Sequence, residues 1–418
     1  MQLYVHVPFC RKRCAYCAFY SIPLSGAENG EPVGQPPGGE NFALRFADNI
    51  CSEMAKRKED IDASSLTSIF FGGGTPSLLS PAAIGQIIDA AARLFSFSDA
   101  MEITMEANPE SLHHKDHFSG LRSAGVNRLS FGVQSFDNGV LRLLGRLHTA
   151  EQAEKAILMA RESGFSNLGI DLIWGVPLLG ADNTGLAKGR TARQQAMLTD
   201  WLQTLERAVE VNPDHISAYG LTMEAGTPLH DRLTGGELVM PEEETATRMF
   251  LEGSDFLESH GFRHYEISNF ARSGKECRHN LGYWQGEDYL GLGPSATSTI
   301  GDLRWTTLMN VPVWDKQVAA TGAAVRDIEN LGPSKKLREK VMLSLRTRAG
   351  LDLFTLIQAI GHPLCPEQIH LVEELQTAGL ASLSGSLLVL TKKGMLVSDE
   401  IIARFFAFSL KETETLDM

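Results

Sequence analysis

The chain has 418 residues and a formal net charge of −13, with fractions of apolar and charged residues that are ordinary for a globular protein. The negative charge argues against a nucleic-acid backbone or an anionic membrane surface as a general partner. No stretch approaches the roughly 18 uninterrupted apolar residues of a membrane-spanning helix.

Strands and helices alternate through the first two thirds of the chain. We predict strands at residues 3–7, 67–71, 101–105, 128–132, 167–173, 215–219 and 264–267. Helices are predicted at 42–57, 81–95, 111–124, 195–211 and 242–260, with further helical stretches up to about residue 164. Alternation at this spacing predicts a parallel sheet. Six or more such units favour a partial or full (β/α) barrel.

Two polar insertions interrupt this alternation. Residues 22–40 are rich in glycine and proline, and residues 178–193 read LLGADNTGLAKGRTAR. Both are predicted to be surface loops without chemistry. With these insertions, residues 1–270 are expected to form the barrel core, and residues 271–332 a connecting segment.

The pattern changes after residue 332. Three helices are predicted at 335–346, 352–359 and 366–378, followed by a strand and turn in SLLVLTKKG and a last helix at 398–408. This order predicts a mainly helical, winged-helix-like domain over residues 333–418. Its basic residues do not gather on one face, so a packing or partner-binding role is favoured over nucleic-acid binding.

The most specific signal is the stretch YVHVPFCRKRCAYCAFY, which places Cys10, Cys14 and Cys17 in one short loop. The basic run at 11–13 is too polar for a loop of buried core thiols. A structural zinc site would need a fourth ligand from elsewhere in the chain, and this alternative stays open. A [4Fe–4S] cluster held by three thiolates would leave one iron open to a non-protein ligand, such as the amine and carboxylate of an amino acid.

Further candidate residues lie in or directly after successive predicted strands. The turn at 72–76 reads GGGTP, Glu106 lies in MEANPES, Gln134 in SFGVQSF and Asp171 in LGIDLIWGVP. Functional groups of a (β/α) barrel gather at the carboxyl ends of its strands, so these residues are expected to lie together. Arg146, in LLGRLH, would supply a cation or lie on a helix surface.

The spacing CxxxCxxC, with an aromatic residue before the last cysteine, resembles the radical S-adenosylmethionine (SAM) enzymes. The motifs YVHVPFC, FFGGGTPS, MEANPE, RLSFGVQSF, LGRLHT and IDLIWGVP further resemble the coproporphyrinogen-III-oxidase-like branch of that superfamily. The resemblance implies a barrel of the radical SAM type whose open iron binds SAM, and one-electron cleavage of SAM to a 5′-deoxyadenosyl radical. No side chain is assigned a catalytic role.

The same resemblance assigns residues to the cofactors. Cys10, Cys14 and Cys17 would hold the [4Fe–4S] cluster. Residues near the cofactor would be Tyr4, Tyr16, Gly73, Gly74, Thr75, Glu106, Gln134, Arg146 and Asp171. The last three match positions that hold a second SAM in the oxidase.

Two sub-branches share these motifs. Oxygen-independent oxidases usually have a fourth cysteine, at the position that is Phe19 here. The HemW-type heme chaperones have the three-cysteine form and an HNxxYW motif, which here comprises His279, Tyr283 and Trp284. This motif has been associated with heme binding, although a buried histidine among aromatic residues is an equally good interpretation of these residues. Ala18 and Thr297 depart from the residues that are frequent in relatives, Asp and His.

The leading hypothesis is therefore a heme chaperone that passes heme to acceptor hemoproteins. The alternative is an oxygen-independent coproporphyrinogen III oxidase in porphyrin biosynthesis, so enzymatic activity stays open, as does a radical SAM enzyme with an unrelated substrate. The expected partners are heme or a porphyrin and an electron donor such as flavodoxin or ferredoxin; the family suggests changes between monomer and dimer. Six cysteines, three of them clustered, and no visible signal peptide predict a cytoplasmic location.

Overall fold

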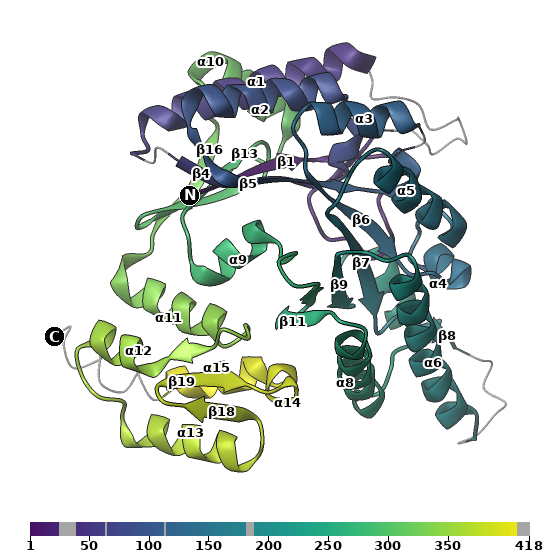
Figure 1. Cartoon of the computed structure of the whole chain (residues 1–418), viewed down its shortest axis with the longest axis vertical. Helices are drawn as coiled ribbons and strands as arrows, with labels where there is room; N and C mark the ends of the chain where they lie inside the picture. Colours follow the sequence, from purple (N-terminus) through teal and green to yellow (C-terminus); the bar gives the residue numbers. More distant parts are fainter. Residues whose placement is uncertain (25–38, 63–64, 113, 181–187, 408–418) are drawn as a thin grey trace.

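The computed structural model describes residues 1–24, 39–62, 65–112, 114–180 and 188–407. Its main feature is a curved sheet of 12 strands in the order β11-β12-β9-β7-β6-β5-β4-β1-β13-β14-β15-β16 (Figure 1). Six neighbouring strands run parallel: β1 (Gln2–Val7), β4 (Ser65–Gly73), β5 (Ser96–Ala107), β6 (Arg128–Gln134), β7 (Leu168–Trp174) and β9 (His215–Gly220).

Antiparallel strands extend the sheet at both edges. They are β11 (Arg263–Glu266) and β12 (Asn269–Ala271) beside β9, and β14 (Thr297–Ile300), β15 (Leu303–Thr307) and β16 (Val325–Asn330) beyond β13 (Tyr289–Leu292), which is parallel to β1. No pairing joins β11 to β16 among the described residues, so the predicted barrel is a partial one.

Helices cover the outer side of this sheet, while α9 lies on its concave side (Figure 1). The helices of this part are α1 (Gly39–Glu59), α2 (Pro81–Leu94), α3 (Lys115–Ser123), α4 (Asn138–Leu143), α5 (Ala150–Glu162), α6 (Lys188–Glu210), α7 (Pro228–Thr234), α8 (Glu243–Ser259), α9 (Arg278–Gln285) and α10 (Val311–Thr321). Local signals start several of them. For example, the Ser80 side chain accepts from the Ala83 N–H ahead of α2, and Pro81 occupies its first turn.

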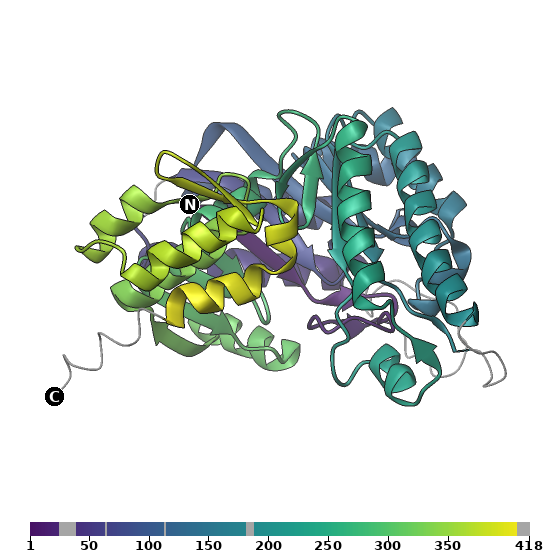
Figure 2. The ribbon, with the colours of Figure 1, turned by 90° about the horizontal axis from the view of Figure 1, so that it is seen from below.

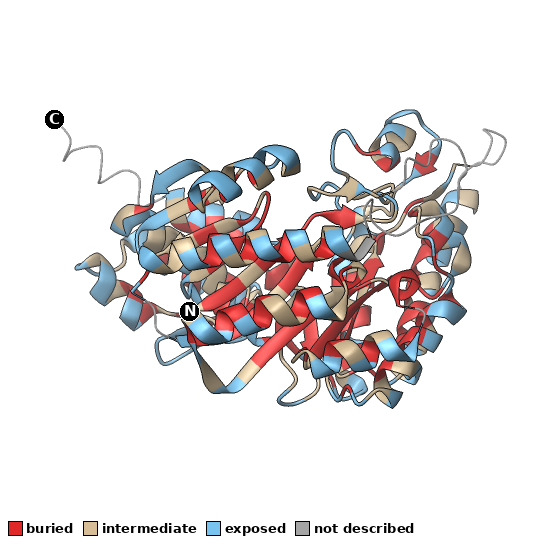
Figure 3. Ribbon diagram, turned by 90° about the horizontal axis from the view of Figure 1, so that it is seen from above, coloured by how far each residue is buried: buried red, intermediate tan, exposed pale blue. Residues whose placement is uncertain are grey.

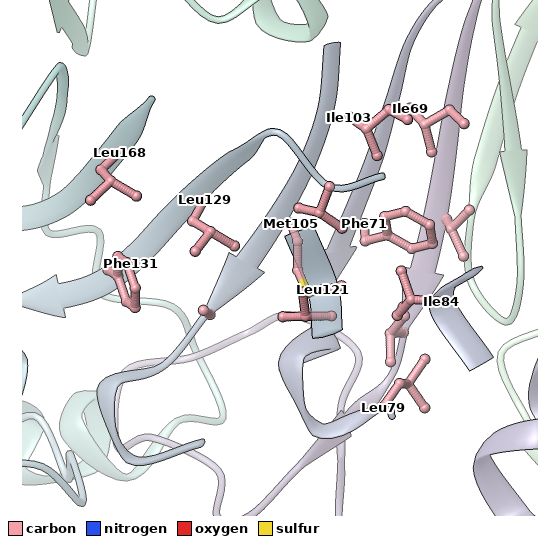
Figure 4. Close-up of a cluster of buried hydrophobic side chains, with 14 of the residues drawn as sticks. Ile69, Phe71, Leu79, Ile84, Ile103, Met105, Leu121, Leu129, Phe131 and Leu168 are labelled. Carbon is pink, nitrogen blue, oxygen red and sulfur yellow. The ribbon is translucent and has the colours of Figure 1, made fainter. Parts of the chain in front are cut away.

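The core lies between the sheet and its outer helices (Figure 4). Ile69 and Phe71 of β4, Met105 of β5 and Leu129 of β6 are all fully or almost fully buried, and α2 contributes Ile84. The central strands are buried on both faces, which explains why they read as near-continuous apolar runs (Figure 3).

The structure corrects two boundaries. The helix expected at 111–124 begins only at Lys115, because Pro109–Ser111 forms a separate 3-10 turn whose Ser111 hydroxyl bonds that of Ser77. The insertion expected at 178–193 is shorter, since β8 (Leu178–Leu179) pairs with β10 (Leu238–Val239) and α6 starts at Lys188.

The other insertion, at 22–40, falls mostly outside the described residues. Its first residues form β3 (Ile22–Pro23), which pairs in parallel with β2 (Phe9–Cys10) of the cysteine loop. The division into a core, a connecting segment and a terminal domain stays a prediction. Within the expected connecting segment, β13 to β16 are part of the main sheet.

The C-terminal part is mainly helical and has a core of its own, beside the barrel (Figure 2). It comprises α11 (Gly332–Ser344), β17 (Leu351–Asp352), α12 (Leu353–Ile360), α13 (Pro366–Thr377), the hairpin β18 (Ala381–Ser384) and β19 (Leu387–Leu390), α14 (Lys392–Leu396) and α15 (Ser398–Ala407). Lys392 of α14 bonds Asp255 and Glu258 of α8 at 2.6 and 2.5 Å. No helix among the described residues is long and apolar enough to cross a membrane.

Glu53 of α1 is a buried acid outside the cysteine loop, and it makes stability depend on pH. One carboxylate oxygen accepts from the Gly293 N–H at 2.8 Å and the Trp314 indole N–H at 3.3 Å. Burial nevertheless raises the pKa of Glu53 from 4.5 to about 7. The pKa of Glu53 is higher in the folded state than in the unfolded chain. Its contribution to the free energy of unfolding is therefore fully present below the unfolded pKa and is lost as pH rises through about 7.

We therefore expect Glu53→Gln to narrow the difference in unfolding free energy between about pH 5 and about pH 8 by about 2–3 kcal/mol. Urea unfolding followed by tryptophan fluorescence at both pH values measures this difference. Glu59→Gln, at the exposed end of the same helix, is the control and should leave the difference as in the wild type. Equal pH dependence in the Glu53 variant and the wild type would contradict the assignment.

Candidate cofactor site

The carboxyl ends of β4 and β5 meet through one hydrogen bond. The Gly73 N–H donates to Oε2 of Glu106 at 3.1 Å. Gly73 has a φ of +108°, and a Cβ there would lie 2.5 Å from the His6 ring. A Cβ on Gly74 would lie 2.7 Å from the Phe9 carbonyl oxygen. The GGGTP turn therefore needs glycine at both positions to pass this close to β1 and β2.

The cysteine loop packs against this turn. Cys10, Cys14 and Cys17 are free, half-buried thiols. The hydroxyl of Thr75 donates to Cys10 Sγ at 3.5 Å. Burial raises the pKa of Cys10 and of Cys17, and the neighbouring thiols add to this effect. A bound cation beside the loop would favour the thiolate forms of Cys10 and Cys17.

Among the described residues, no three His, Cys, Asp or Glu side chains are close enough together to hold a single metal ion. A single zinc ion gathers its thiolates at about 2.3 Å, whereas a cubane spreads its ligands over separate irons. Three thiols on one loop, with a half-buried arginine and a glycine turn beside them, fit the donor set of such a cluster.

Arg146 lies against the cysteine loop instead of on a helix surface. Its guanidinium donates to Cys14 Sγ at 3.2 Å, to Asn108 Oδ1 at 2.5 Å and to the Gly132 carbonyl at 2.7 Å. It also bonds the Tyr16 hydroxyl. These contacts tie the loop to the ends of β5 and β6.

A cavity of about 160 Å³ lies inside the barrel next to these strand ends. Its lining residues are Tyr4, Phe70, Glu106, Arg128, Ser130, Asp171, His215, Ser217, Tyr219, His279, Asn280 and Tyr283. Of the residues expected from the sequence, the cavity thus brings together Tyr4, Glu106, Asp171, His279 and Tyr283. The other expected residues do not line the cavity: the three cysteines, Tyr16, Gly73, Gly74, Thr75, Gln134, Arg146 and Trp284.

Burial raises the pKa values of two carboxyl groups in the cavity. Burial, and then the charge of Asp171, raises the pKa of Glu106 to about 8. Burial also raises the pKa of Asp171, against hydrogen bonds from the Ser217 and Ser130 hydroxyls. A cationic group placed beside Glu106 would favour its ionised form.

Gln134, at the end of β6, adopts a φ of +66°, which is uncommon for a residue other than glycine. This conformation breaks the pairing register with β7 at the strand end. Backbone strain of this kind often accompanies functional positions. The side chain lies close to Gly132, beside Arg146 and Asn108.

His279 is almost fully buried, and its protonation state agrees with the expected role as a heme ligand. Its Nδ1 bonds the Ser68 hydroxyl at 2.9 Å, and its Nε2 has no partner among the described residues. Burial lowers the pKa of His279 to about 3, so the ring is neutral. A neutral imidazole with one fixed and one free nitrogen fits the chemistry of an axial ligand.

The space around His279 does not fit a heme. The ring is 1% exposed, stacks on Phe70 and has Tyr283 against its edge. The Nε2 atom is itself buried, so a heme iron cannot reach it in this conformation. Trp284 does not line this cavity; its side chain bonds Glu266. In this conformation the three motif residues do not form a heme pocket.

Sequence reasoning missed several residues of the site. Asn108 lies within MEANPES, the motif that pointed to Glu106, and it donates to Thr75 Oγ1 at 2.9 Å. His6 lies two residues after Tyr4, on the same face of β1, and its Nδ1 bonds the Tyr4 hydroxyl at 3.0 Å. Side chains two residues apart on a strand share one face, so the position of Tyr4 could have indicated His6 as well. Arg128 and His215 gave no signal, because each begins an apolar strand.

Comparison with known proteins agrees with this geometry. Residues 4–182 match the model of the Radical SAM superfamily, and residues 331–397 match the HemN C-terminal domain. The chain is 34% identical over 400 residues to heme chaperone HemW of Mycobacterium tuberculosis, covering 96% of this chain and 93% of that protein. It is 30% identical over 403 residues to heme chaperone HemW of Bacillus subtilis, covering 96% and 98%.

Among solved structures, the chain is similar to coproporphyrinogen III oxidase (HemN) from Escherichia coli. The TM-score is 0.77 with 26% sequence identity, over 97% of this chain and 89% of that one. The partial barrel, the mainly helical C-terminal part and these matches confirm the fold and the family that the motifs predicted. The chain belongs to the HemN-like radical SAM family, in the branch of the relatives named heme chaperone HemW.

Proposed function

We propose that this chain binds heme and transfers it to acceptor hemoproteins, with a radical SAM core that carries a [4Fe–4S] cluster. The observation that carries the proposal is similarity along 96% of the chain to relatives named heme chaperone HemW. The three-cysteine loop supports the proposal, because the oxidase pattern has a fourth cysteine where this chain has Phe19. The Phe19 side chain is 71% exposed. The proposed location is the cytoplasm, where reduced thiols persist.

The proposed cofactor roles follow from the contacts. Cys10, Cys14 and Cys17 hold the cluster, and Glu106 accepts from the ammonium group of SAM beside the Gly73 turn. When bound, cluster and SAM supply one-electron chemistry. Around them, the Gly73 N–H keeps the Glu106 carboxylate oriented, and Tyr4 closes one wall of the cavity. Asp171, within β7, and Gln134, at the end of β6, are proposed to contact a second SAM.

The proposed heme contacts are His279, Tyr283 and Trp284, and they depend on a movement of α9. Ligation by His279 would require α9 to leave the concave side of the sheet. Its start is held by the Glu102 carboxylate, which accepts from the Arg278 and His279 N–H groups at 3.3 Å, and by the Gln2 side chain.

The second candidate function is oxidative decarboxylation of coproporphyrinogen III. The observation that favours it is the similarity of the whole fold to the Escherichia coli oxidase. The electron donor that such chemistry needs would be a flavodoxin or a ferredoxin.

The two functions are separated by one pair of assays on the cluster-loaded chain. Heme-loaded protein is passed through a desalting column and mixed with an apo-hemoprotein, and in parallel the protein is given coproporphyrinogen III, SAM and a reductant. Retention and then transfer of heme, without protoporphyrinogen IX, supports the chaperone. Formation of protoporphyrinogen IX without heme retention would overturn it in favour of the oxidase.

A further inference from the structure

Arg146 is placed to act on the cluster loop, and the cofactor roles above do not use this contact. One guanidinium nitrogen, Nη1, donates to Cys14 Sγ at 3.2 Å. The other, Nη2, is held by Asn108 Oδ1 at 2.5 Å and by the Gly132 carbonyl at 2.7 Å. Since the second nitrogen is anchored on two strand ends, the first has a fixed direction towards the sulfur.

The segment around Arg146 is built to hold this position. Gly145 adopts a φ of +74°, and a Cβ there would lie 3.1 Å from the Ala15 nitrogen. The Ala15 N–H donates to the Leu144 carbonyl at 2.9 Å. The cysteine loop and the turn after α4 are therefore docked backbone to backbone, with the arginine between Cys14 and the barrel.

A cationic donor on a ligand thiolate has a defined electrostatic effect. Adding an electron to a cluster increases its negative charge, and a hydrogen bond from a guanidinium to a ligand sulfur stabilises that charge. The interaction is strong where the group is shielded from water. The exposed Arg13 differs, because its Nε donates to the Cys17 carbonyl oxygen and not to sulfur, and solvent screens its charge.

We propose that Arg146 is a positioning residue that raises the reduction potential of the cluster, by donating a fixed, charged hydrogen bond to Cys14 Sγ. This inference rests on the proposed cluster at the three cysteines. It gives Arg146 a role that exists before SAM arrives, and so differs from the expectation that it holds a second SAM.

The test is a redox titration of the reconstituted full chain without SAM, followed by electron paramagnetic resonance of the reduced cluster. We expect Arg146→Gln to shift the midpoint potential to a more negative value than that of the wild type. Arg146→Lys should shift it in the same direction but less, because lysine keeps the charge and cannot reach all three acceptors. Arg13→Gln, which removes an exposed charge that also acts on Cys17, should shift the potential less than Arg146→Gln does.

Iron and sulfide are counted in each variant first. Arg146→Gln with a full cluster and the wild-type potential would overturn the inference. If that variant does not load, Arg146→Lys decides: a shifted potential supports the inference, and the wild-type potential overturns it. Absence of iron from the wild type would contradict the proposed cluster itself.

Discussion

Replacing Cys14 by serine is expected to abolish the cluster, lowering bound iron from about four per chain to nearly none. The physical reason is that all three thiolates sit on one loop, so that two remaining sulfurs cannot hold a cubane. Anaerobic reconstitution followed by iron and sulfide analysis measures the effect. Serine keeps the size of the side chain and the contact to Arg146, which limits damage to the fold.

The matched control is Cys51→Ser. Cys51 is a half-buried thiol of α1 whose Sγ bonds the Gln86 carbonyl at 3.8 Å, away from the cysteine loop. The Cys51→Ser variant should bind as much iron as the wild type. Full iron content in the Cys14 variant would mean that the metal is held elsewhere, and one zinc ion in place of iron in the wild type would restore the zinc alternative.

Replacing Glu106 by glutamine is expected to weaken SAM binding by roughly 10- to 100-fold, the range for losing one charged hydrogen bond. Glutamine keeps the shape and can still accept from the Gly73 N–H. It cannot become an anion, so the ammonium group of SAM loses its counter-charge in a site where burial makes that charge valuable. Equilibrium dialysis of labelled SAM with the cluster-loaded variant measures the change.

Glu151→Gln serves as the control, because this exposed carboxylate of α5 lies outside the cavity. Its SAM affinity should equal that of the wild type. An unchanged affinity in the Glu106 variant with a full cluster would remove Glu106 from the SAM site. The turn and the cysteines would keep their assignments, since the two readouts are independent.

The parallel sheet and the barrel class followed from the sequence because apolar strands alternate with helices at the spacing of strand–helix–strand units. The residues after β4 and β5 could be placed together because parallel strands bring their carboxyl ends to one edge. Glu106 and Gly73 accordingly meet in a hydrogen bond.

Other features depend on long-range packing that no local pattern reports. The sequence left Arg146 open as a cation of the site or a helix-surface residue, and the docking of residue 144 on residue 15 is what turns it towards Cys14. For His279 the sequence left a heme ligand and a buried histidine among aromatic residues open; the packing of α9 against β4 buries it, in agreement with the second interpretation. The addition of β13 to β16 to the main sheet likewise depends on the pairing of β13 with β1, 287 positions away at the first register pair, Gln2 with Tyr289.

The measurement that tests the central claim most directly is an anaerobic absorption spectrum of the reconstituted wild-type chain before and after adding heme, with iron and sulfide counted. The account predicts a broad cluster absorption with about four irons, and then a sharp heme band that survives desalting. A cluster of full iron content with no retained heme band would contradict the proposal that this chain is a heme chaperone.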